Sequence, residues 1–165
     1  MGYIGPCVIQ RLRSILPDAT LIGLDTGFFA NGLTNAKILP ECAADIQYFA
    51  DVRNLHSGLL DDVDAVIHLA AISNDPMGNQ FEDVTFEINY RASIRLAKSA
   101  KKAGVNSFVF ASSCSMYGTA EDEARTEDSP LNPLTAYAKS KVSTEKELAT
   151  LAENGFKVTC LRFAT

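Results

Sequence analysis

The 165-residue sequence has few of the features that mark several protein classes. No apolar run approaches the roughly 18 residues that a membrane-spanning helix needs, and no signal peptide is visible, so we expect a soluble, cytoplasmic protein with no membrane partner. The four cysteines show no Cys-x-x-Cys spacing and there are only two histidines, so we expect neither a metal site nor a redox pair. The net charge of −5 argues against a nucleic-acid-binding surface.

What is present is a globular composition, with 47% apolar and 21% charged residues, and we expect one domain over residues 1–165. Apolar segments with strand character alternate with helical patterns along the chain. The expected strands are residues 20–25, 46–50, 65–71, 107–111 and 157–163, and the expected helices are residues 7–16, 54–60, 81–103 and 136–154. This alternation predicts an α/β fold with a mostly parallel sheet.

The N-terminal segment has the order of a dinucleotide-binding unit. Gly2 and Gly5 precede a helical stretch, and a buried strand follows that ends at Asp25. The glycines would let the backbone approach a pyrophosphate, and Asp25 would accept hydrogen bonds from an adenosine ribose, which favours NAD over NADP. A plain turn and a polar strand end are equally good interpretations of these residues taken singly. The strand that should precede the glycines is absent, so we expect the fold to lack its first strand.

A second pattern lies in the last helix, where Tyr137 and Lys141 are four residues apart and therefore on one helix face. A nearby ammonium favours the phenolate form of a tyrosine, whose usual pKa is about 10, so Tyr137 could act as a base near neutral pH. Ser113, at the end of an apolar strand, could hydrogen-bond the oxygen that exchanges the proton. Alone, the pair also fits a solvated helix face with an ordinary tyrosine.

Four candidate positions come at the ends of predicted strands. Asp25, Asp51, Ala70-Ala71 and Ser112-Ser113 each follow or end an apolar strand. Ligands of parallel sheets gather outside the carboxyl ends of the strands. We therefore expect these residues to share one rim of the sheet.

Taken together, these segments resemble the extended short-chain dehydrogenase/reductase family, in particular the NAD-dependent epimerase/dehydratase group that acts on nucleotide sugars. The matching segments are Gly2-Tyr3-Ile4-Gly5, Leu24-Asp25, Asp51-Val52, His68-Leu69-Ala70-Ala71, Ser112-Ser113 with Tyr117-Gly118, and Tyr137-Ala138-Lys139-Ser140-Lys141. They occur in the family's order over nearly the whole chain.

The resemblance implies a doubly wound, Rossmann-like sheet and a hydride transfer at a sugar carbinol carbon. It makes Tyr137 the catalytic acid/base, has Lys141 hold the nicotinamide ribose, and has Ser113 hydrogen-bond the sugar oxygen. The implied NAD-binding residues are Gly2, Tyr3, Ile4, Gly5, Asp25, Asp51, Val52, Leu69, Ala70, Ala71, Tyr137 and Lys141. It also places Asn89 near the site, although a polar helix position is the plainer interpretation, and implies a nucleotide-sugar substrate and a homodimer through the two long helices.

Two departures from the family refine these expectations. Nucleotide-sugar 4,6-dehydratases carry an Asp-Glu pair where this chain has Cys114 and Ser115, so epimerisation by transient oxidation, or reduction of a ketosugar, fits better than dehydration. Members of the family are much longer, so we expect the C-terminal substrate domain to be missing as well. A catalytically inert, truncated NAD-binding module is the remaining alternative. We expect His68, inside an apolar strand, to be a core histidine.

Overall fold

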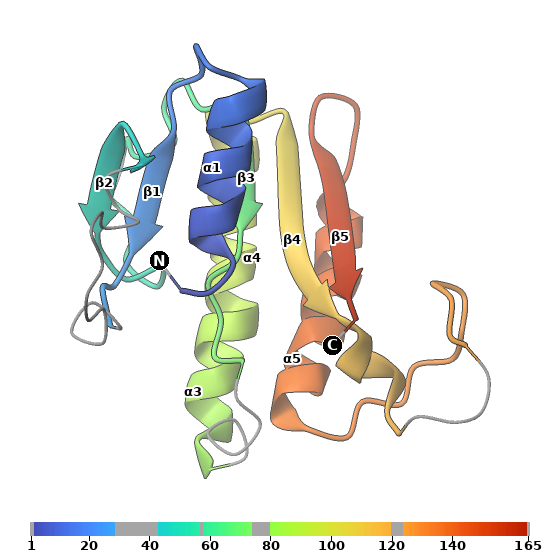
Figure 1. The fold of residues 1–165 in the computed structure, drawn as a ribbon. Coiled ribbons are helices and arrows are strands. Elements are labelled where there is room, and N and C mark those ends of the chain that lie inside the picture. The colour runs from blue at the N-terminus through green and yellow to red at the C-terminus, as the bar shows by residue number, and fades with distance from the viewer. Residues whose placement is uncertain (1, 29–42, 57, 74–79, 120–123, 165) are drawn as a thin grey trace. The chain divides into compact units, whose positions relative to one another are not determined.

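The computed structural model describes residues 2–28, 43–56, 58–73, 80–119 and 124–164. The chain divides into two compact units, Met1–Leu55 and His56–Thr165 (Figure 1). Both units contain parallel strands and helices, so the predicted α/β fold with parallel strand pairing is confirmed. Its strands lie in a two-stranded and a three-stranded sheet among the described residues. No helix in this described part of the chain is long and apolar enough to cross a membrane.

The first unit consists of helix α1 (Gly5–Ile15) and the parallel strands β1 (Ile22–Asp25) and β2 (Ile46–Phe49). Arg13 and Asp45 join these elements. The guanidinium of Arg13 donates to Asp45 and to the carbonyl of Ala19 at 2.8 Å, and Asp45 also accepts from the Leu21 N–H at 2.7 Å. The Leu21 hydrogen bond, followed by that of Arg13, lowers the pKa of the Asp45 carboxyl. The pair therefore connects the end of α1 to the beginnings of both strands.

The second unit contains the parallel strands β3 (Ala65–His68), β4 (Ser107–Ser113) and β5 (Lys157–Phe163), with β4 in the middle. Its helices are α3 (Glu82–Phe86), the π-helix η3 (Glu87–Ala92), α4 (Ser93–Ala103), the 3₁₀ helix η4 (Cys114–Tyr117) and α5 (Ala136–Leu151). Helices α4 and α5 lie along the same side of this sheet (Figure 1). A parallel sheet needs such cover because its strands are apolar along their whole length.

Aromatic side chains of β4 form the centre of the core in this unit. Phe108 and Phe110 are almost completely buried, and the Phe108 ring lies 6.2 Å from that of Phe156. Met116 and Leu148 are buried with them. Each such side chain contributes on the order of 2 kcal/mol of hydrophobic stabilisation relative to an exposed one. The core therefore lies between β4 and α5, beside the residues predicted to be catalytic.

Two helices differ from the sequence-based expectation. The long helix predicted over residues 81–103 forms but contains the π-helix η3, in which the Asn89 carbonyl accepts from the Ser93 hydroxyl at 2.8 Å and from the Thr144 hydroxyl at 3.0 Å. The short helix predicted over residues 54–60 is not present in its described residues, which form a bend at Asn54 and a turn over residues 58–60. Just before this range, the Asp51 carboxylate accepts from the Arg53 N–H at 2.8 Å, and the Asp51 carbonyl accepts from the Asn54 N–H at 2.9 Å.

Candidate active site

The end of β4 presents two buried serines. Ser113 forms the N-cap of η4, where its hydroxyl oxygen accepts from the Ser115 N–H at 3.2 Å. This contact uses a lone pair of Ser113 and leaves its hydroxyl hydrogen able to donate to another oxygen. The Ser112 hydroxyl is buried and has no hydrogen-bond partner among the described residues. A buried polar atom without a partner is unusual in a folded protein, and a catalytic role is one of the explanations for it.

Helix α5 places Tyr137 and Lys141 beside that strand end. Thr135 caps the helix by accepting from the Ala138 N–H at 3.1 Å, so Tyr137 lies in the first turn and Lys141 one turn later. The Lys141 ammonium donates to the Ala111 carbonyl of β4 at 2.7 Å, and it lies 5.4 Å from the centroid of the Tyr137 ring. The predicted shared helix face is confirmed.

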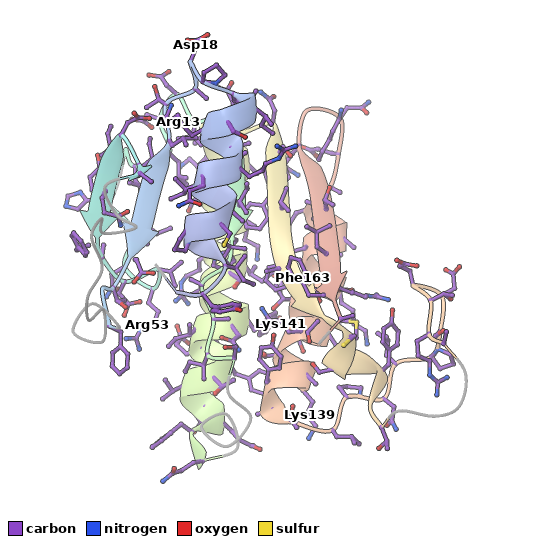
Figure 2. The ribbon with its side chains drawn as sticks, in the orientation of Figure 1. Arg13, Asp18, Arg53, Lys139, Lys141 and Phe163 are labelled. Carbon is purple, nitrogen blue, oxygen red and sulfur yellow. The ribbon has the colours of Figure 1, made fainter. Side chains whose placement is uncertain are left out.

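Lys141 differs sharply from an ordinary surface lysine. It is 2% exposed, whereas Lys139, two residues earlier, is exposed to solvent (Figure 2). Burial lowers the pKa of Lys141 to about 8, although the negative charge of Glu145 partly opposes that shift. The ammonium has three N–H groups, and the Ala111 carbonyl accepts from one of them. Lys141 is therefore a buried cation with donors left for a ligand.

His68, at the end of β3, is buried as expected of a core histidine. Its Nε2 lies 2.8 Å from the Ser93 hydroxyl, which itself donates to the Asn89 carbonyl. Because the Ser93 hydrogen is already used, Nε2 must be the donor, which assigns the hydrogen of the neutral ring to that nitrogen. Burial, followed by the charge of Lys141, lowers the pKa of His68 to about 3. His68 therefore adds no positive charge beside Lys141 near neutral pH.

Asn89 is completely buried in η3 and makes three side-chain hydrogen bonds. Its amide accepts from the Ile72 N–H at 2.8 Å and donates to the Ile72 carbonyl at 2.9 Å and to the Ser140 hydroxyl at 3.3 Å. Ser140 in turn donates to the Tyr137 carbonyl at 2.7 Å. The side chain thus connects the segment after β3, where Ala70 and Ala71 lie, to the helix of Tyr137. Asn89 is thus a helix position as expected, but a buried one that holds two segments together, and its place near a cofactor site stays a prediction.

The predicted cofactor residues of the first unit surround the start of α1 and the ends of its strands. Helix α1 has no side-chain N-cap, and a Cβ added at Gly2 or Gly5 would meet no atom within 4 Å. Local packing does not explain these glycines, whereas the close approach of a ligand to the helix N-terminus would. Asp25 accepts from the Gly27 N–H at 2.7 Å through one carboxylate oxygen.

Asp51 and Val52 follow β2 in the same unit. Asp51 pairs with Arg53 at 2.6 Å, and this hydrogen bond is the main cause that lowers the pKa of Asp51. Val52 is 8% exposed. Asp25 ends β1 and Asp51 follows the neighbouring parallel strand β2 in the first unit, and in the second unit Ala70-Ala71 follow β3 and Ser112-Ser113 end β4. That all four positions share a single rim stays a prediction.

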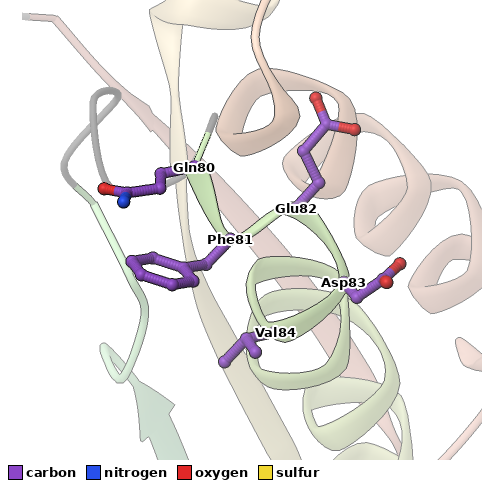
Figure 3. Close-up of a pocket in the computed structure, with 5 residues that line it drawn as sticks. All are labelled: Gln80, Phe81, Glu82, Asp83 and Val84. Atoms are coloured by element: carbon purple, nitrogen blue, oxygen red, sulfur yellow. The ribbon is translucent and has the colours of Figure 1, made fainter.

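Two surface hollows are formed by described residues that lie outside the predicted site. One of about 490 Å³ lies at the beginning of α3 (Figure 3), and another of about 450 Å³ lies at the opposite end of β4 and β5 from Ser113. Their lining residues are Gln80, Phe81, Glu82, Asp83 and Val84 in the first and Asn106, Ser107, Gly155 and Lys157 in the second. None of these is a predicted site residue. Across the described ranges, no group of three or more His, Cys, Asp or Glu residues is arranged to hold a metal ion.

A comparison with known families matches residues 1–165 to the NAD dependent epimerase/dehydratase family. The chain belongs to this family. Its relatives include the UDP-glucose 4-epimerase of Lactobacillus helveticus, which is 35% identical over 168 residues. That alignment covers 98% of this chain and 48% of the relative. An uncharacterised UDP-glucose epimerase of Bacillus subtilis is 33% identical over 99% of this chain and 54% of its own length. The chain thus spans about half the length of these curated relatives.

Solved structures of family members have the same fold. MoeE5 in complex with UDP-glucose and NAD superposes with a TM-score of 0.78 at 27% identity, over 98% of this chain and 50% of that one. The UDP-glucose 4-epimerase of Stenotrophomonas maltophila with bound NAD gives a TM-score of 0.81 at 26% identity, over 98% and 49% of the two chains. These likenesses confirm the Rossmann-like fold and the assignment to a family of NAD-dependent enzymes.

Proposed function

We propose that the chain is the NAD-binding part of a nucleotide-sugar epimerase, with all 165 residues belonging to one such domain. The observation that carries the proposal is the buried ammonium of Lys141, held between the Ala111 carbonyl and the Tyr137 ring. A lone buried lysine is costly to a fold and needs a reason. Interaction with a cofactor ribose and a phenolate is such a reason, and the UDP-glucose 4-epimerase relative supports the assignment.

The residues present fit NAD as the cofactor. The uncapped start of α1 at Gly5, preceded by Gly2, Tyr3 and Ile4, suits a pyrophosphate, and Asp25 at the end of β1 suits the adenosine ribose. The other residues that would hold it are Asp51, Val52, Leu69, Ala70, Ala71, Tyr137 and Lys141. When bound, NAD would supply an acceptor for the hydride of a sugar carbon and could return that hydride.

The chain's own residues would carry the proton chemistry. Lys141 has N–H groups left to hold ribose hydroxyls, and its charge would stabilise the phenolate of Tyr137. The Tyr137 oxygen would take the proton of the sugar hydroxyl and later return it. Ser113, whose oxygen already accepts from Ser115, would donate its hydrogen to the same sugar oxygen.

Epimerisation fits the site better than dehydration. Elimination of water needs an acid and a base beside the hydroxyl-donating serine, and the two following positions hold Cys114 and Ser115 instead. The Ser115 hydroxyl is buried without a hydrogen-bond partner in the described part of the chain, so it offers a polar contact but not a carboxylate. The site can therefore exchange one proton with a sugar hydroxyl, but Cys114 and Ser115 do not supply the further acid and base that would eliminate water.

Calorimetric titration of the purified chain with NAD tests the cofactor assignment. We expect saturable binding that is weakened at least about tenfold in Asp25→Ala and in Lys141→Met, because each variant removes a polar contact to a ribose. Lys139→Met is the matched control, since it removes an exposed lysine of the same helix. A folded chain that does not bind NAD, or that binds it equally well in all three variants, would contradict the proposal.

A further inference from the structure

The guanidinium of Arg162, on β5, joins three other elements of the second unit. It pairs with the Glu145 carboxylate of α5 at 2.7 Å, and its Nε contacts both oxygens of that carboxylate at 3.2 Å. It also donates to the Tyr117 hydroxyl at 2.8 Å and to the Glu127 carbonyl at 2.9 Å. The side chains of Arg162 and Glu145 are 18% and 12% exposed, so the pair is largely shielded from water.

These partners belong to the two parts of the candidate active site. Tyr117 is the last residue of η4, the short helix that Ser113 caps. Glu145 lies one turn after Lys141 on α5, and the segment of Glu127 leads into the start of that helix. Arg162 therefore contacts both the turn that presents Ser113 and the helix that presents Tyr137 and Lys141.

We propose that Arg162 is a positioning residue of this site, which through Glu145 and Tyr117 fixes the Ser113 turn relative to the helix of Tyr137 and Lys141. Only the effect of Arg162 on catalysis rests on the proposed function. The arrangement itself is a property of the chain and can be tested without cofactor or sugar.

An exposed ion pair between α4 and α5 provides a comparison for the shielded Arg162–Glu145 pair. Lys98 and Glu147 are 2.8 Å apart, with side chains 56% and 31% exposed. Water and salt screen such a pair, and its loss changes little. Loss of one partner of the shielded Arg162–Glu145 pair leaves the other partly buried and uncompensated, which is far more disruptive. Lys98→Met is therefore the matched control for variants of Arg162.

Arg162 also affects the charge around Lys141. The groups that face Lys141 are Glu145 and Tyr137 from its own helix, neutral His68 from β3, and the Phe110 ring of β4. Glu145 is the negative charge among them, and Arg162 neutralises it. Removal of the Arg162 charge should raise the pKa of Lys141, and removal of the Glu145 charge should lower it. If either change merely loosened the packing around Lys141, water would reach the ammonium and the pKa of Lys141 would rise in both variants.

The test is a nuclear magnetic resonance titration of the full chain labelled with ¹³C at lysine Cε, with Lys141 assigned through Lys141→Arg. We expect the pKa of Lys141 to rise by at least about half a unit in Arg162→Met and to fall by a similar amount in Glu145→Gln. Arg162→Lys, which keeps the charge, should stay near the wild-type value, as should Lys98→Met. Shifts of the same sign in Arg162→Met and Glu145→Gln would overturn the proposal.

Amide hydrogen exchange of the same variants measures how readily the turn after Ser113 opens. The Ser115 N–H, which donates to Ser113, should exchange at least about tenfold faster in Arg162→Met, while amides of α4 stay protected. Unchanged Ser115 exchange would also overturn the proposal. Both readouts use the chain without NAD, so they remain decisive even if the chain binds no cofactor.

Discussion

At the residue scale, the site depends on polar side chains that are buried and mutually hydrogen-bonded. The chain of contacts from His68 through Ser93 to the Asn89 carbonyl leaves no buried donor without an acceptor along it. Such networks are stable only when complete, because an unpaired polar group in a low-dielectric interior is costly. The protonation state of one member can therefore influence the stability of the whole unit.

His68 should make the stability of the protein depend on pH in the acid range. Its pKa is about 3 in the folded chain and about 6.5 when exposed, so between these values only the unfolded chain binds a proton. The free energy of unfolding should accordingly rise with pH up to about 6.5 and then level off. Between pH 6.5 and pH 4, His68 accounts for a loss of roughly 3 kcal/mol.

Urea unfolding of wild-type and His68→Gln proteins across this pH range measures the contribution. The variant should be less stable at pH 7 but should lose less stability on acidification, and His56→Gln, at an exposed histidine, serves as the comparison. Equal pH slopes for wild type and His68→Gln would show that the buried histidine does not govern the acid response.

At the element scale, glycines occupy the ends of α4 and η4 for different reasons. Gly104 ends α4 with φ of 87°, and Gly118 follows η4 with φ of 83°. Both conformations favour glycine, but their surroundings differ. A Cβ at Gly104 would meet no atom within 4 Å, whereas one at Gly118 would lie 2.5 Å from the Asn132 carbonyl oxygen. Only the second glycine is required by close packing as well as by backbone conformation.

The substitutions Gly104→Ala and Gly118→Ala should therefore have unequal effects. We expect the first to cost about 1 kcal/mol, from backbone strain alone. The second adds a steric clash with backbone and should cost at least about 2 kcal/mol more. Chemical denaturation of the two variants gives the comparison directly. Equal losses of stability would mean that the segment around residue 132 yields easily and does not hold the turn next to Tyr117.

At the scale of the whole molecule, the two units differ in how many apolar side chains they bury. In the described part of the first unit, Val52 is the only buried apolar residue, and α1 has no buried residue at all. The second unit contains the buried aromatic core and helices α4 and α5 with many buried positions. A two-stranded sheet with a half-exposed helix is marginally stable alone.

Hydrogen exchange followed by mass spectrometry should resolve this difference. Amides of α1 should exchange at least about tenfold faster than those of α4 and α5, because their hydrogen bonds open without breaking a core. The helices of the second unit serve as the internal reference. Equal protection of α1 and α5 would contradict the expectation and would mean that the first unit opens only when the whole chain unfolds.

The secondary structure was largely accessible from sequence because it depends on local periodicity. All five strands form where apolar segments predicted them, although β3 ends at His68 and not at residue 71. A strand ends where its hydrogen-bonded pairing ends, and β3 pairs with β4 from Ala65 to His68. The helix predicted over residues 54–60 does not form in its described residues, and its first residue, Asn54, instead donates its N–H to the Asp51 carbonyl of the preceding turn.

The amino-acid sequence by itself determined the α/β class, the shared face of Tyr137 and Lys141, and the family, because these follow from spacing along the chain. The tertiary structure alone decided the burial of Lys141, the π-helix at Asn89 and the Arg162–Glu145–Tyr117 contacts. Arg162 lies 17 residues from Glu145 and 45 from Tyr117, so no local pattern marks the network. Desolvation and hydrogen bonds between distant segments exist only once β4, β5 and α5 have packed together, and these interactions give the candidate site its chemistry.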